Sequence, residues 1–69
     1  MDEAPELRLL FHRLNNQLGI ILAHAELLEA KAPDEMNRAR ASQVVSSTLE
    51  AMGTAKEIRR LASTSAEPQ

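Results

Sequence analysis

The placement of the prolines is the feature that most constrains how this chain folds. Pro33 is the only proline between residues 6 and 67, and it divides the interior into two long proline-free stretches. A proline inside a helix removes a hydrogen bond, and it pushes the residue before it out of the helical region. In a first helical turn it is tolerated, which suits both Pro5 and Pro33. The sequence therefore predicts one long helix on each side of Pro33.

The predicted helices have definite bounds. The first runs over residues 5–31 and the second over 34–62, with a turn at 32–33. Most residues in both have good helix propensity. We expect residues 1–4 to form an N-terminal tail and the polar residues 63–69 to form a disordered one.

Apolar residues recur at steps of three and four in both segments, which is the spacing of one helix face. In the first they are Leu7, Leu10, Phe11, Leu14, Leu18, Ile21, Ala25 and Leu28. In the second they are Ala41, Val44, Val45, Thr48, Ala51, Met52, Ala55, Ile58 and Ala62. No alternating run long enough for a strand occurs. The predicted fold is all-α, an antiparallel two-helix hairpin.

The apolar content is small for a chain that folds alone. Of 69 residues, 43% are hydrophobic, but many of these are alanine, and there is no cysteine for a disulfide. Domains this short usually need a disulfide, a metal or a partner chain. Leu9, Ile20 and Leu27 fall well off the main stripe of the first helix and indicate a second buried face, more in keeping with a dimer core than with a docking patch. We therefore expect two hairpins to pair into a homodimeric four-helix bundle.

Charge and composition argue against several classes of partner. Eight Lys and Arg against ten Asp and Glu give a net charge of −2, and Phe11 is the only aromatic residue. Nucleic acid is therefore a poor candidate. The apolar run at 18–25 is too short to cross a bilayer, and the acidic start lacks the basic residues of a signal peptide. His12 and His24 are too few for a zinc site unless carboxylates complete it. We expect a cytoplasmic protein with no metal, cofactor or membrane partner.

His12 is the residue that most suggests chemistry. It lies about 160° around the helix from Leu14, so it faces away from the main apolar stripe. Asn16 and Gly19 follow on the same side, one and two turns later. A neutral imidazole exposed on a rigid helix can act as a nucleophile toward a phosphoryl group. A histidine that is simply solvated on the surface is the alternative reading.

The sequence from His12 to Leu28, HRLNNQLGIILAHAELL, resembles the H-box helix of the dimerisation and histidine phosphotransfer (DHp, HisKA-like) domain of sensor histidine kinases. It is most similar to the subgroup that reads His, an acidic residue, Leu or Phe, Asn, Asn, any residue, Leu. This resemblance implies a homodimeric four-helix bundle in two-component signal transduction. It implies that His12 is the phosphoacceptor and that Asn16 supports it by orienting water. The implied partner is a response-regulator receiver domain or a histidine kinase.

Arg13 departs from this family pattern. The family has Asp or Glu there, thought to act as a general base in autophosphorylation, and arginine cannot accept a proton. Gly19 and Gly53 alone cannot form a phosphate-binding loop, so we expect no self-sufficient kinase. Exchange of a phosphoryl group with a receiver aspartate is less affected, and Arg13 itself can pair with phosphate. The alternative is a non-catalytic dimerisation or adaptor module with a degenerate H-box.

Overall fold

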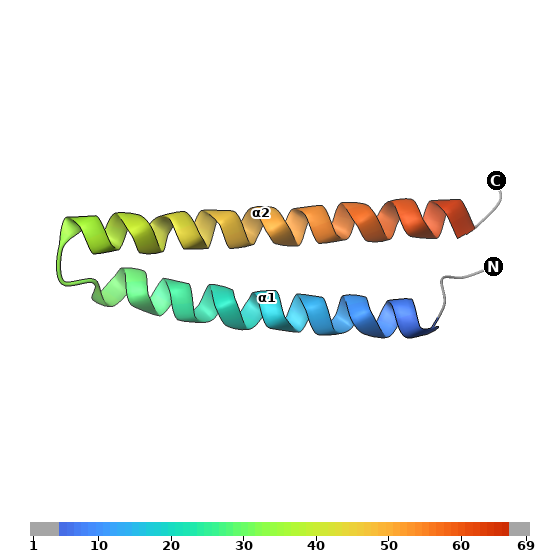
Figure 1. Cartoon of the computed structure of the whole chain (residues 1–69), viewed down its shortest axis with the longest axis horizontal. Helices are drawn as coiled ribbons and strands as arrows, with labels where there is room; N and C mark the ends of the chain where they lie inside the picture. Colours follow the sequence, from blue (N-terminus) through green and yellow to red (C-terminus); the bar gives the residue numbers. More distant parts are fainter. Residues whose placement is uncertain (1–4, 67–69) are drawn as a thin grey trace.

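The protein is an antiparallel hairpin of two long helices (Figure 1). A computed structural model describes the backbone of residues 5–66 and the side chains of residues 5–62. Helix α1 spans Pro5–Lys31 and helix α2 spans Glu35–Ala66, and no strand occurs in the described part of the chain. The predicted all-α hairpin is confirmed.

The turn between the helices is fixed by a cap on α2. The backbone N–H of Asn37 donates to Asp34 Oδ1 over 2.8 Å, and the Asn37 side-chain amide donates to Asp34 Oδ2 over 3.2 Å. A carboxylate at this position satisfies an N–H group that has no partner within the helix and meets the positive end of the helix dipole. Asp34 is therefore the cap that precedes the helix, which begins at Glu35, one residue later than predicted.

The far end of α2 differs from the prediction. The helix continues through Ala66, so residues 63–66, which we expected in a disordered tail, are helical. The polar composition suggested an end at residue 62, but no glycine or proline occurs between residue 62 and Pro68. The predicted tail segments at 1–4 and 67–69 lie outside the described residues.

The two helices meet along a seam of small and medium side chains. The buried residues are Phe11, Ala25, Ala41, Thr48 and Ala55. Half-buried positions between them continue the spacing of three and four: Leu7, Asn15, Leu18 and Leu22 on α1, with Val45, Met52 and Ala62 on α2. The Thr48 hydroxyl donates a hydrogen bond to the Val44 carbonyl over 2.7 Å. Thr48 is the only buried polar residue among those that the structure describes, so this bond satisfies its side chain. Alanine at three buried positions permits close approach of the helices.

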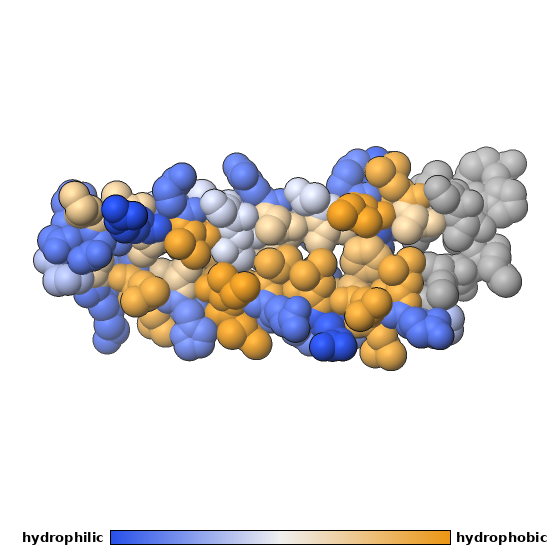
Figure 2. All heavy atoms as spheres, in the orientation of Figure 1, coloured by the Kyte–Doolittle hydropathy of each residue, from blue (hydrophilic) through white to orange (hydrophobic). Residues whose placement is uncertain are grey.

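Only part of each predicted apolar stripe lies in this seam. Leu10, Leu14, Ile21 and Leu28 of α1 and Val44, Ala51 and Ile58 of α2 are exposed; we call these seven residues the open face. Both helices contribute to one side of the hairpin, because Leu28 and Val44 line the same hollow. Figure 2 shows hydrophobic side chains along α1 and along the boundary with α2. The seam within one hairpin therefore uses one edge of each stripe and leaves the other edge exposed.

Candidate functional site

His12 lies in the third turn of α1 with its side chain exposed. Among the described residues, no side chain or backbone group is hydrogen-bonded to the imidazole or paired with it. His12 borders an open hollow of about 300 Å³ together with Pro5, Arg8 and Leu9. The structure thus places an imidazole with no hydrogen-bond partner among the described residues beside an open hollow.

The residues that follow His12 on this side of α1 leave the approach clear. Asn16, one turn later, is exposed, and Asn15 beside it is half-buried toward the seam. A methyl group added at Gly19 would meet nothing within 4 Å, so the space two turns from His12 is open. His12, Asn16 and Gly19 therefore share one side of a single rigid helix, as their spacing predicted.

Arg13 is exposed and brings no carboxylate to the site. On a helix, the side chains nearest to a given residue are those three and four positions away. For His12 those neighbours are Arg8, Leu9, Asn15 and Asn16, none of which is acidic. Within α1 the imidazole thus has no neighbouring general base, and its immediate charged neighbours are cationic.

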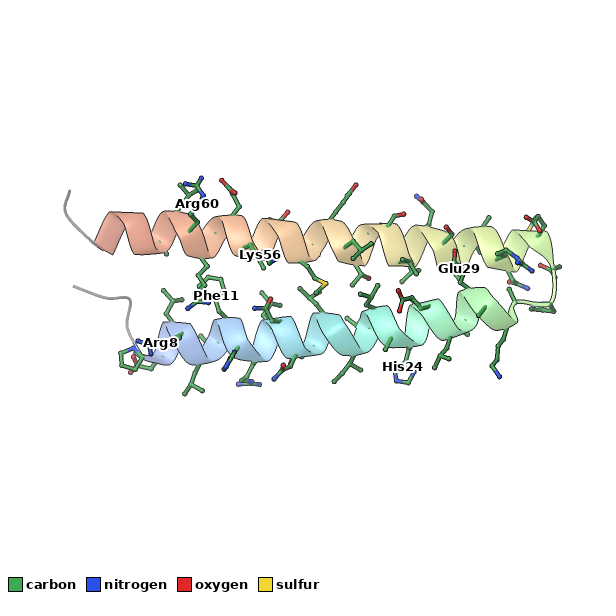
Figure 3. The ribbon with its side chains drawn as sticks, turned by 180° about the vertical axis from the view of Figure 1, so that it is seen from behind. Arg8, Phe11, His24, Glu29, Lys56 and Arg60 are labelled. Atoms are coloured by element: carbon green, nitrogen blue, oxygen red, sulfur yellow. The ribbon has the colours of Figure 1, made fainter. Side chains whose placement is uncertain are left out.

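His24 provides an internal comparison. It is also exposed and lies on the side of α1 that faces away from α2 (Figure 3). Twelve residues of helix separate it from His12 by about 18 Å along the axis. Its neighbours at three and four positions are all apolar, namely Ile20, Ile21, Leu27 and Leu28. The two histidines cannot share a ligand, and no group of three metal-ligating side chains occurs in the described part of the chain.

The end of α2 nearest the N-terminus of α1 carries several cations. Lys56 and Arg60 lie at the same end of the hairpin as Phe11 and Arg8 (Figure 3). The Arg60 guanidinium donates a hydrogen bond to Glu57, and this bond together with the opposite charge lowers the pKa of the Glu57 carboxyl. Because both side chains are exposed, the pair contributes little to stability.

Sequence reasoning identified His12, Arg13 and Asn16 but missed two features of the surface. The first is the open face, which the sequence pattern merges with the seam. The second is a hollow of about 330 Å³ near the turn, with an apolar wall that includes Leu28, Ala41 and Val44 and with Lys31, Asn37 and Arg40 also lining it. Its residues come from both helices, so only the pairing of the helices brings them together.

Comparison with protein-family models, curated proteins and solved structures finds no match to this chain. Neither helix of the described residues combines the length and the apolar character needed to span a bilayer.

Proposed function

We propose that the protein is a phosphotransfer module of two-component signalling, in which His12 exchanges a phosphoryl group with a receiver-domain aspartate. One observation supports this most. An imidazole with no partner among the described residues stands on a rigid helix, within the one segment whose sequence resembles an H-box, and its approach is open. The other exposed histidine, His24, has neither the motif nor polar neighbours.

The proposed step is a displacement at phosphorus. The lone pair of the neutral His12 imidazole forms the N–P bond, and the P–O bond to the receiver aspartate breaks, so the aspartate leaves as a carboxylate. The reverse step returns the phosphoryl group to the carboxylate. No proton has to be removed from the attacking nitrogen, because neutral imidazole already carries a lone pair there. The lack of an acidic neighbour at Arg13 therefore does not block transfer.

Arg13 has a role in this proposal that an acidic residue would not have. The Arg13 guanidinium directly follows the acceptor in sequence, and its positive charge attracts the anionic phosphoryl group. Asn16, one turn along, offers a neutral amide on the same side of α1. We assign both residues to supporting the phosphorylated state of His12.

A small phosphoryl donor tests the reactivity of His12 without requiring a cognate partner. Phosphoramidate transfers its phosphoryl group to imidazole and releases ammonia. We expect His12 to be modified faster than His24, because its charged neighbours attract the donor whereas His24 is flanked by apolar side chains. His24→Ala should leave the acid-labile product in place and His12→Ala should remove most of it. Modification confined to His24 would refute the assignment.

A non-catalytic adaptor is the second candidate, and a specific surface favours it. Leu9, Ile20 and Leu27, which the sequence led us to expect in a dimer core, are more than half exposed on α1 and lie to one side of both the seam and the open face. These side chains offer a partner protein an apolar contact surface. Under this reading a receiver or kinase binds this surface, so Ile20→Asp should abolish binding while His12→Ala leaves it intact. Loss of binding in His12→Ala alone would count against the adaptor.

We also propose that the hairpin works as a homodimer, joined through the open face into a four-helix bundle. The chain exposes 5450 Å². That is about 1,100 Å² more than the roughly 4,300 Å² expected for a compact monomer of this mass. A standard protein interface buries about 800 Å² on each partner. A second copy on the open face would therefore account for most of the excess.

A further inference from the structure

The hollow near the turn, which we call the turn hollow, is large enough for a small ligand. Its volume is about 330 Å³. An apolar cavity of about 150 Å³ holds one benzene ring, and ligand sites in proteins begin at about 300 Å³. Both helices and the turn between them contribute to the lining: Leu28, Lys31, Ala32, Pro33, Asn37, Arg40, Ala41 and Val44. At roughly twice the benzene volume, the turn hollow has room for a chain of about eight carbons.

The wall of the turn hollow is mostly apolar. Its two largest apolar side chains keep much of their surface in solvent, since Leu28 is 66% exposed and Val44 is 46% exposed. Water leaves such surface favourably when an alkyl chain covers it, and each fully buried methylene strengthens binding by about fourfold. The wall therefore favours a ligand with an alkyl chain.

The turn hollow also carries two cations and no acidic residue. Lys31 is the last residue of α1, and Arg40 lies in the second turn of α2. Among the described residues, no hydrogen bond or ion pair joins either side chain to another group. The acid nearest in sequence, Asp34, does not line the hollow, and both of its carboxylate oxygens accept hydrogen bonds from Asn37. The charge at the turn hollow is therefore positive and unmatched.

We infer that the turn hollow binds a carboxylate with an unbranched chain of about eight carbons. The chain lies against Leu28 and Val44, and the carboxylate meets Lys31 and Arg40 at the edge of the hollow. Both cations pair with a carboxylate through charge-assisted hydrogen bonds. Exposed ion pairs alone are weak, so binding requires the chain as well as the charge.

The turn hollow lies at one end of the open face, because Leu28 and Val44 belong to both. None of the seven residues of the open face is acidic, so they bring no counter-charge from a second copy to Lys31 or Arg40. A bound carboxylate covers Leu28 and Val44 and thus competes with the second copy, a consequence that rests on the proposed self-association. Two competing events weaken each other by the same factor.

Titration of the isotope-labelled protein with octanoate, followed by NMR, tests the site. Backbone amide signals of the residues that line the turn hollow should shift most, and those around Ile20 on the outer side of α1 should stay in place. Butanoate, which lacks four of the methylenes, should bind weaker by about tenfold or more. Equal shifts around Ile20 would mean that octanoate coats any apolar surface, which would overturn the inferred site.

Charge variants test the position of the carboxylate. Arg40→Gln and Lys31→Gln should each weaken octanoate binding by about fivefold, the upper range for an exposed ion pair. Octanol has the same chain without the charge, so its binding should respond to neither variant. Arg38→Gln is the matched control, because Arg38 is exposed on the same helix, pairs with Glu35 and does not line the hollow. Equal weakening in Arg38→Gln, or none in Arg40→Gln, would overturn the inferred contacts.

Sedimentation with and without octanoate tests the competition separately. At an octanoate concentration equal to its own dissociation constant, the apparent dissociation constant of the dimer should rise about fourfold, a factor of two for each copy. Butanoate at the same concentration is the control and should change it little. A dimer that is unaffected by bound octanoate would overturn the competition. A protein that is monomeric without octanoate would refute self-association, whereas the amide signals at the turn hollow would still decide the binding site.

Discussion

Replacing Ile21 by alanine provides the sharpest quantitative test of the open face. The substitution removes three carbon atoms from a side chain that is still 46% exposed in the hairpin. Burying a methylene is worth about 0.8 kcal/mol, so the part still to be covered by a second copy amounts to about 1 kcal/mol per chain. Two chains lose this contribution in each dimer, or about 2 kcal/mol in all, which corresponds to about a 30-fold increase in the dissociation constant.

Ile20 offers a matched control for this measurement. It is the same residue type at the adjacent position and is 59% exposed, but it points to the outer side of α1. Ile20→Ala therefore removes the same atoms and a similar share of contacts within the hairpin without touching the second copy. Sedimentation equilibrium over a range of concentrations should show a much weaker dimer for Ile21→Ala and a dissociation constant close to the parent value for Ile20→Ala. Equal weakening in both variants, or greater weakening in Ile20→Ala, would refute the position of the interface.

Three further substitutions probe the cap, the seam and the edge of the open face. Asp34→Ala removes the acceptor for the Asn37 N–H and should lower the free energy of unfolding in urea by about 1 kcal/mol. Glu35→Ala should lower it much less, and an equal loss in the two variants would contradict the role of Asp34 as the cap. Phe11→Ala empties the seam at its one aromatic residue, which is 8% exposed, and should cost about 3 kcal/mol per chain. A loss below about 1 kcal/mol would mean that the helices do not pack there. His24→Leu extends the apolar face between Ile21 and Leu28 and should tighten the dimer in sedimentation; an unchanged or weaker dimer would place His24 away from the interface.

The fold was predictable from the sequence because few residues determine it. Pro33 allowed only one place for the turn, and the spacing of apolar residues fixed the type of both long elements. The end of α2 was less predictable. Serine and threonine at 63–65 favour neither state strongly, and the next residue that disfavours a helix is the proline at 68.

The division of each stripe into seam and open face was not predictable from rotation around the helix. Leu14 and Leu18 lie within about 40° of each other on α1, so periodicity assigns both to one face. What separates them is the close approach of α2 at Ala25, Ala41 and Ala55. Small residues bring the helix axes together along one line and leave larger neighbours on the flank exposed. Which residues lie on that line depends on how the two helices pair.

The candidate site likewise has some features that the sequence predicts and others that it does not. The exposure of His12 and the shared side of His12, Asn16 and Gly19 follow from spacing within one helix, so sequence alone predicted them. The hollow beside His12 lies near the start of α1, where Pro5, Arg8 and Leu9 also line it. The hollow near the turn required both helices. Contacts that join the two helices are the part that local spacing does not determine.

Transfer of a labelled phosphoryl group from phosphorylated receiver domains tests the central claim most directly. The account predicts that acid-labile label moves to the parent protein and to His24→Ala, but not to His12→Ala. The helix content of all three proteins should be equal, because His12 and His24 are both exposed. Label that reaches His12→Ala as readily as the parent would contradict the account, as would a parent protein that binds a receiver but never accepts its phosphoryl group.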